Sequence, residues 1–157
     1  MPYIQMLVVF MKSTQIYLIC WLLSLFTFVS CFFYPAFNPD SSVPVESMKL
    51  FLLGWIGPLH GHFSWYANLL YIISLLIFEK TNIAISFSAL ALLLSLSFLS
   101  TEDVFNGSGV TTIEGYGAGY YLWISAILIL FIGQVFYKSR KTTNKTSKKD
   151  ALKRTSS

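Results

Sequence analysis

Charged residues are scarce in this sequence. Only 11% of the 157 residues are Asp, Glu, Lys or Arg, whereas 55% are hydrophobic. An ordinary soluble domain carries roughly 25% charged residues. Mean hydropathy is +0.62. A chain with so little charge cannot cover itself with a water-facing surface, so the composition predicts an integral membrane protein of one domain.

Asp, Glu, Lys, Arg and His are absent from the interior of four long apolar runs, which cover about 16–34, 63–78, 83–99 and 120–137. Ion-coupled transporters normally mark their pathway with such residues, and most are built from internal repeats, of which this sequence shows none. No nucleophile, base and orienting group stand in a recognisable arrangement. We therefore assign no catalytic residue and no cofactor, and the sequence argues against a transporter and leans against an enzyme.

Cysteine is limited to Cys20 and Cys31, both in the first apolar run. Eleven residues of helix separate them by roughly 16 Å, and a disulfide needs Cα atoms within about 7 Å. They are not expected to bond to each other. The stretch 28–31 also resembles a bacterial lipoprotein cleavage site with Cys31 as the lipidated residue, but the chain after it stays apolar. An uncleaved span is favoured, and lipidation of Cys31 remains open.

The four apolar runs predict an all-α membrane protein, a bundle of about four antiparallel transmembrane helices. The first run would cover roughly 28 Å of helix, close to the 30 Å hydrocarbon core. The segment 47–57 is too short to span and predicts an interfacial or re-entrant helix. The domain is expected to cover residues 1–137, and the Lys-, Ser- and Thr-rich tail 138–157 is expected to be disordered. In an alternative with five spans, 47–57 also crosses.

Orientation follows from the positive charges. In the four-span arrangement Lys12, Lys80 and the eight Lys and Arg residues of the tail lie on one side, and Lys49 alone lies on the other. Because cytoplasmic loops carry an excess of Lys and Arg, both termini are predicted to be cytoplasmic. The tail could also attract anionic lipid headgroups. Nothing indicates nucleic acid as a partner.

Metal ligands are few. His60 and His62 flank one glycine, and Glu46 lies on the same predicted side. A metal site usually needs three or four ligands. These three residues are weak candidates for a metal site, and headgroup-level loop histidines are the favoured interpretation.

Small and amide residues predict helix packing within the bilayer. Gly115 and Gly119 have the spacing that lets helices approach closely. Asn68 and Gln134 could hydrogen-bond between helices. A stripe of small residues in the third run is the expected face for helix contact, and it consists of Ala84, Ser88, Ala91 and Ser95.

Aromatic residues gather near the non-cytoplasmic interface. Seven take part: Trp55, Trp65, Tyr66, Tyr116, Tyr120, Tyr121 and Trp123. An interfacial aromatic belt is the favoured explanation, with a ligand or partner site as the alternative.

The segments 53–58, 63–68 and 119–123, which read LGWIGP, FSWYAN and GYYLW, resemble small uncharacterised multi-span inner-membrane proteins of Gram-negative bacteria. Many of these have Pro where this chain has Leu69. The resemblance implies a location in the bacterial inner membrane and brings no activity. We expect an interaction or accessory protein. A bacteriocin-immunity-like protein and a membrane metal-binding protein or enzyme using the outer-face histidines are the alternatives.

Overall fold

The computed structural model describes residues 2–39, 44–77, 80–105 and 110–155, and it leaves out the side chains of 2–13, 39, 60, 105, 110–111, 144–145 and 147–155. Helices dominate the fold. In chain order the elements are α1 (Pro2–Cys31), β1 (Pro35–Pro39), β2 (Val45–Glu46), α2 (Ser47–Leu53), the 3-10 helix η1 (Gly54–His60), α3 (Tyr66–Leu76), α4 (Thr81–Ser97), the 3-10 helix η2 (Phe98–Ser100), β3 (Asp103–Phe105), β4 (Val110–Tyr116) and α5 (Ala118–Thr155).

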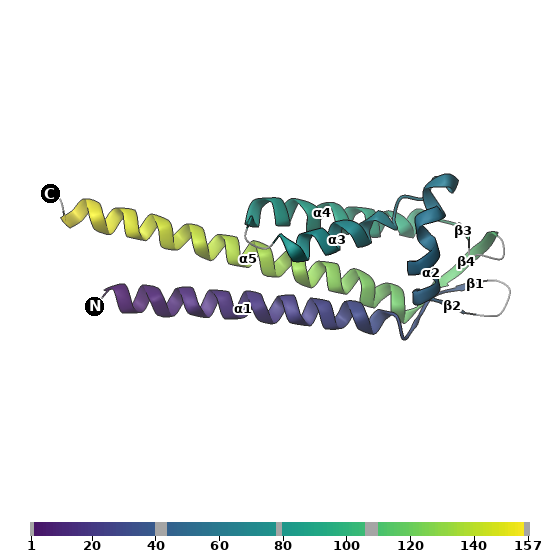
Figure 1. The fold of residues 1–157 in the computed structure, drawn as a ribbon, viewed down its shortest axis with the longest axis horizontal. Helices are drawn as coiled ribbons and strands as arrows, with labels where there is room; N and C mark the ends of the chain where they lie inside the picture. Colours follow the sequence, from purple (N-terminus) through teal and green to yellow (C-terminus); the bar gives the residue numbers. More distant parts are fainter. Residues whose placement is uncertain (1, 40–43, 78–79, 106–109, 156–157) are drawn as a thin grey trace.

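The helices α1, α3, α4 and α5 lie side by side and alternate in direction (Figure 1). Both chain ends lie at one end of this bundle, and the strands lie at the other. The most extensive contact between elements is that of α1 with α5, and α4 packs against both α3 and α5. An antiparallel helical bundle was the prediction, and its helical part is confirmed.

Three helices are long and apolar enough to cross a membrane, within Thr14–Cys31, Thr81–Ser100 and Ala118–Thr143. They correspond to the first, third and fourth predicted spans. The second prediction, 63–78, is only partly helical, because α3 has 11 residues, about 16 Å of helix; Phe78 lies outside the described residues. The segment Ser47–Leu59 is also shorter than a span, as expected for the 47–57 segment and unlike the five-span alternative.

A four-stranded antiparallel sheet, in the order β2-β1-β4-β3, corrects the all-α prediction. The strands lie in the connection between the first predicted span and the 47–57 segment and in the connection between the third and fourth predicted spans. Phe37 in β1 pairs with Tyr116 in β4, a partner that no local pattern reveals. The β-branched residues of 110–113 are the one local signal that favoured a strand. The sheet buries a small core of Ala36, Phe37, Val45 and Val104.

The basic tail is helical where the structure describes it. It was expected to be disordered from residue 138, but α5 continues without a break to Thr155. A helix that is already formed adds further residues without a new nucleation step, which is the costly part of helix formation. Thr142 and Thr143 each donate a side-chain hydrogen bond to the backbone carbonyl four residues earlier. The helix thus extends past the end of its apolar segment.

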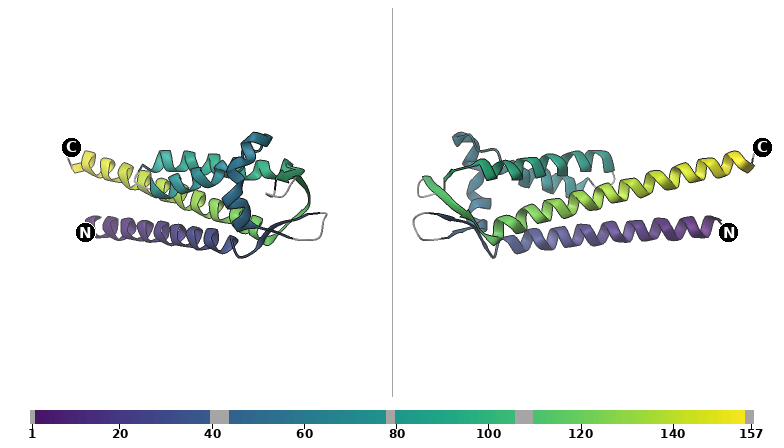
Figure 2. Two further views of the ribbon diagram at one scale, coloured as in Figure 1. Left: turned by 45° about the vertical axis from the view of Figure 1, so that its right-hand side comes forward. Right: turned by 180° about the vertical axis from the view of Figure 1, so that it is seen from behind.

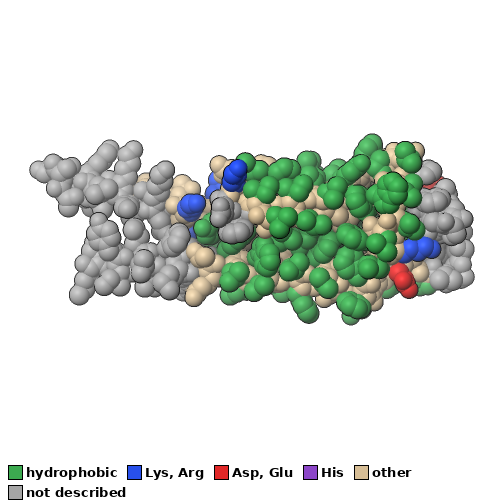
Figure 3. All heavy atoms as spheres, viewed as in Figure 1, with side chains coloured by type: hydrophobic (Ala, Val, Ile, Leu, Met, Phe, Trp, Pro, Cys, Tyr) green, Lys and Arg blue, Asp and Glu red, His purple; other side chains and the backbone are tan. Residues whose placement is uncertain are grey.

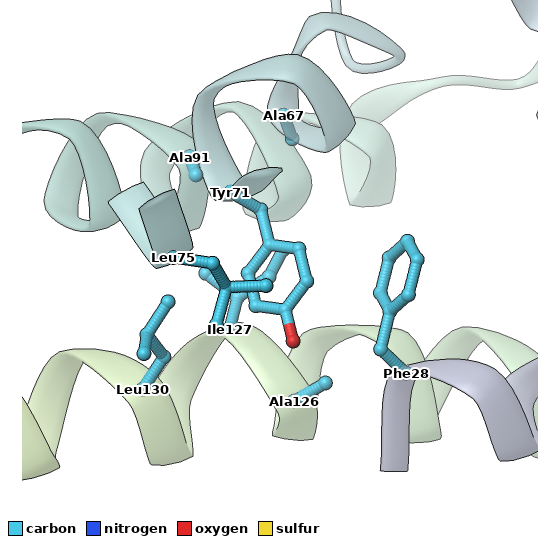
Figure 4. Close-up of a cluster of buried hydrophobic side chains, with 8 residues drawn as sticks. All are labelled: Phe28, Ala67, Tyr71, Leu75, Ala91, Ala126, Ile127 and Leu130. Carbon is cyan, nitrogen blue, oxygen red and sulfur yellow. The ribbon is translucent and has the colours of Figure 1, made fainter. Parts of the chain in front are cut away.

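The main core lies where α3 meets α1, α4 and α5 (Figure 4). Tyr71 of α3 stacks on Phe28 of α1, with ring centroids 4.7 Å apart. The predicted small-residue stripe of α4 is fully buried, because Ala84, Ser88, Ala91 and Ser95 are each 0% exposed. The prediction that this face mediates helix contact is confirmed, and the contact is within the molecule.

On the face of the bundle that Figure 3 shows, hydrophobic side chains cover most of the length and charged side chains lie towards the two ends. Leu22 and Phe26 of α1 and Leu93 of α4 are among the exposed large hydrophobic residues. An apolar band between charged ends is the surface that a bilayer requires of a membrane protein.

Candidate functional site: a cavity at the sheet end of the bundle

The length of α3 creates a space at the sheet end of the bundle. α3 has 11 residues and its antiparallel neighbour α4 has 17. The N-terminus of α3 therefore does not reach as far towards the sheet as the C-terminus of α4 does. The chain preceding α3, α2 and η1, crosses over the bundle at this end (Figure 2). Trp65, which directly precedes α3, links α3 to α2, since its indole Nε1 donates a hydrogen bond to the Phe51 carbonyl of α2 at 2.8 Å. Gly54 lies against the Trp65 ring and leaves no room there for a Cβ.

This cap does not fill the space, and a cavity of about 110 Å³ remains. Its wall is mainly apolar and comes from segments far apart in the chain. The apolar side chains include Phe32, Leu50, Phe51, Leu53, Phe98 and Trp123, and the polar ones are Ser47, His62, Ser64, Asn68 and the Tyr120 hydroxyl. No Asp, Glu, Lys or Arg is among the described residues of the wall.

Some of these polar groups are already paired. The Ser47 hydroxyl donates to the Tyr34 carbonyl at 2.9 Å, and the Tyr120 hydroxyl donates to the Ser95 carbonyl at 3.1 Å. Both bonds tie the wall to neighbouring elements. Neither hydroxyl therefore has its proton free for a molecule inside the cavity.

Asn68 is different because only one half of its amide is paired. Trp123 Nε1 lies 2.8 Å from Asn68 Oδ1. An indole N–H only donates, so it fixes the amide oxygen towards Trp123 and turns the NH₂ group away from it. Within the described residues that NH₂ group has no acceptor, although Asn68 is only 6% exposed.

Ser64 lies one helical turn before Asn68 and shares its position on the wall. It is 8% exposed, and its hydroxyl makes no hydrogen bond with any residue that the structure describes. Two donor groups of nearly buried residues thus line this mainly apolar cavity without an acceptor among the described residues. Ser64 was not among the candidate residues predicted from the sequence, and Asn68 was predicted only to bond between helices.

The histidine and acidic candidates are only partly brought together. His62 lines the cavity and is half-buried, whereas Glu46 is exposed at the start of α2 and does not line it. The backbone of His60 ends η1, and its side chain lies outside the described residues. Among the side chains that are described, no group of three His, Cys, Asp or Glu residues could hold a metal ion.

Cys31 ends α1 and lines the cavity as a buried, unbonded thiol. Cys20 is also free, in agreement with the expectation that the two do not form a disulfide. Lipidation of Cys31 is not tested by this geometry.

The second amide residue, Gln134, lies in a polar cluster inside the bundle. Its side-chain oxygen accepts from the Ser88 hydroxyl at 2.7 Å, and its NH₂ group donates to Ser74 Oγ at 2.8 Å. Further along the bundle, Ser24 of α1 bonds the Tyr71 hydroxyl and donates to the Ala126 carbonyl. Asn68 and Gln134 therefore both connect helices, as predicted.

The two glycines of the predicted packing pair behave differently. Gly119 lies against the Ser47 hydroxyl and the carbonyls of Tyr34 and Pro35, so a Cβ there would collide with them. Gly115 lies in β4 with open space where a Cβ would be. Gly119 thus allows a close approach as predicted, but the backbone it approaches is that of Tyr34 and of Pro35 in β1 and does not belong to another helix.

The residues of the predicted aromatic belt fall into two groups, one exposed and one turned towards the cavity. Trp55 and Tyr121 are exposed, at 60% and 58%, as an interfacial belt requires. Trp65 and Trp123 instead turn their indole N–H groups inward and line the cavity.

A comparison of the chain with protein-family models, curated proteins and solved structures finds no match. The function of this chain is therefore inferred from its own geometry.

Proposed function

We propose that this chain is a multi-pass protein of the bacterial inner membrane that binds another membrane protein and acts as an accessory subunit. In this arrangement four helices cross the bilayer, with α3 as the short one, and both termini are cytoplasmic. The distribution of charge supports the orientation. Lys80, Lys138 and Arg140 are exposed towards the end that carries the termini, and Glu46, Glu102 and Glu114 are exposed on the segments at the sheet end.

Inside the bundle, the polar groups are used for holding the helices together. Ser74, Ser88 and Gln134 bond one another or backbone carbonyls. The small-residue stripe of α4 is also buried within the molecule, so it is not accessible to a partner. A partner must therefore contact another surface.

The observation that carries the proposal is the exposed apolar surface of the cap. Large side chains point outward from α2, η1 and the residues that follow them: Met48, Leu52, Trp55, Leu59 and Phe63 are 46%, 58%, 60%, 82% and 56% exposed. They lie on segments that cross the bundle end, close to the charged Glu46 and Lys49. Contiguous apolar surface next to polar residues is typical of protein interaction sites, and Trp and Met are enriched in them.

Site-specific crosslinking tests this proposal in native membranes. Benzoylphenylalanine is placed at Leu59, on the cap, or at Leu93, an exposed residue of α4 in the apolar band, which serves as the control. After illumination, the tagged chain is purified in mild detergent and analysed by mass spectrometry. We expect one crosslinked protein at position 59, in roughly equal amount to the chain, and none at position 93. A monodisperse monomer without crosslinks at position 59 would contradict the accessory role.

A further inference from the structure

We propose that the cavity binds the oxygen-bearing end of an uncharged, lipid-soluble molecule, whose acceptor oxygen takes hydrogen bonds from Asn68 Nδ2 and the Ser64 hydroxyl. This site goes beyond the proposed accessory role and does not depend on it. The cap surface that would meet a protein faces outward, whereas the cavity lies beneath the cap.

The two donors carry the inference because both belong to nearly buried residues of the cavity wall and neither has an acceptor among the described residues. Neither atom is sealed off, since Tyr17 is the residue whose unpaired oxygen is fully buried in the described part of the chain, so an oxygen inside the cavity can reach them. Asn68 is held in place by the Trp123 indole, so its amide cannot turn to bring its oxygen into the cavity without losing that bond. Ser64 lies one turn away on the same wall. Residues one helical turn apart are neighbours, so the proposed acceptor oxygen lies between these two side chains.

The wall also indicates that the ligand is uncharged. No described Lys, Arg, Asp or Glu side chain faces the cavity, and an ion brought into an apolar site without a partner pays several kcal/mol of lost hydration. A carbonyl oxygen needs only the hydrogen bonds that Asn68 and Ser64 provide. Its apolar neighbour atoms would pack against Phe51, Leu53 and Phe98.

The volume of the cavity limits how much of the ligand can enter it. An apolar cavity of about 150 Å³ holds one benzene ring, and this cavity has about 110 Å³. The bound part is therefore the carbonyl group with the first few carbons attached to it, and the remaining chain extends out of the cavity. Two sources supply this chemistry, the ester carbonyl of a membrane lipid and the ketone-type carbonyl of a diffusible lipid-soluble compound.

The test uses the full chain labelled with 5-fluorotryptophan in detergent micelles, and fluorine NMR of its four tryptophans. Trp65 and Trp123 line the cavity, whereas Trp21 and Trp55 do not. The probes are methyl hexanoate, which has an ester oxygen, 2-octanone, which has a ketone oxygen, and heptane, which has neither. We expect saturable shifts of the Trp65 and Trp123 signals with at least one oxygen-bearing probe, and no saturable shift with heptane.

Two substitutions test the donors. Ser64→Ala should weaken binding of the preferred probe roughly threefold to tenfold, the usual effect of one net hydrogen bond. Ser97→Ala, which changes an exposed serine of α4, should leave it unchanged. Asn68→Leu should abolish the preference for an oxygen. If Asn68→Leu does not fold, Ser64→Ala alone decides.

Tighter binding of methyl hexanoate would assign the site to a lipid ester, and tighter binding of 2-octanone would assign it to a diffusible carbonyl compound. Either result supports the proposal. Equal binding of heptane, unchanged affinity in Ser64→Ala, or shifts that appear equally at Trp21 and Trp55 would overturn it, because the donors would then serve only water and the probes would merely partition into the micelle.

Discussion

Gln134 shows what a single polar side chain does inside an apolar bundle. It is 1% exposed and joins three helices, since it belongs to α5 and bonds Ser74 of α3 and Ser88 of α4. Apolar contacts allow helices to slide or rotate at little cost, but hydrogen bonds of this kind fix one relative position. Gln134 therefore acts on alignment more than on overall stability.

Replacement of this residue tests that balance. Gln134→Leu removes the two short hydrogen bonds to the Ser88 and Ser74 hydroxyls and a longer one of 3.4 Å to the Ser74 carbonyl, and bonds of this type average about 0.6 kcal/mol each in a membrane protein. The full penalty for buried unsatisfied groups does not apply, because Ser74 keeps the Ala84 carbonyl and Ser88 keeps the Ile85 carbonyl as acceptors. We expect the free energy of unfolding to fall by about 1 kcal/mol, measured by titration from mild detergent into sodium dodecyl sulfate.

The control for this measurement is Val135→Leu, an exposed position next to Gln134 on the same helix. It should leave the unfolding midpoint unchanged. An equal effect of both substitutions would show that the hydrogen bonds contribute nothing measurable.

Single residues were predictable from the sequence only in part. A polar amide in a long apolar run already indicated an interhelical bond for Asn68 and Gln134. Their partners could not be predicted, because Trp123 lies 55 positions from Asn68 and Gln134 lies 60 from Ser74. Ser64 gave no signal, since its importance comes from the cavity and serine is common in helices throughout this chain.

Secondary-structure elements show a similar division. Hydrophobic run length predicted α1, α4 and α5 because each helix satisfies its own backbone within the apolar region. Hydrophobic run length did not predict the bounds of α3, because the apolar stretch continues beyond both ends of this helix. Apolar composition alone does not distinguish a helix from a turn. The sheet was missed because its pairing joins β1 to β4, two short segments about 75 residues apart.

The junction between the sheet and α5 gives a test at the level of elements. Gly119→Ala places a Cβ against Ser47 and the carbonyls of Tyr34 and Pro35. Overpacking of this kind costs about 1–3 kcal/mol, more than the gain of up to about 1 kcal/mol that alanine brings in a helix. We expect a lower melting temperature in detergent. The measurement is the temperature at which the heated protein no longer elutes as a monodisperse peak in size-exclusion chromatography.

Gly115→Ala is the matched substitution, four residues earlier and with open space at the Cβ position. It should have almost no effect on melting. A similar loss for both glycines would instead indicate that the whole 115–119 segment tolerates no added side chain.

The whole molecule has an unequal distribution of charge between its two ends, and this predicts its orientation. In a chain that carries Cys20→Ala and Cys31→Ala, Thr112→Cys places a thiol on β4, and Ser139→Cys places one on the exposed part of α5. In intact cells a membrane-impermeant maleimide should label Thr112→Cys almost completely. Ser139→Cys should be labelled only after permeabilisation.

Labelling of Ser139→Cys in intact cells would contradict the cytoplasmic location of the C-terminus. A third variant, Lys80→Cys, reports on α3, because a helix that crosses puts the hairpin between α3 and α4 on the same side as Ser139. Protection of Lys80→Cys in intact cells, with labelling after permeabilisation, is therefore the result expected of four crossings.

The short α3 also has an electrical consequence. A helix carries a partial positive charge at its N-terminus, equivalent to roughly half an elementary charge. In most membrane-spanning helices that charge lies in water, where it is screened. α3 instead begins beside the cavity, at Tyr66 between Ser64 and Asn68, in surroundings of low dielectric constant. A carbonyl oxygen bound here would face the positive end of the α3 dipole, which favours it over an alkyl chain, although the first N–H groups of α3 are already paired with the carbonyls of Phe63, Ser64 and Trp65.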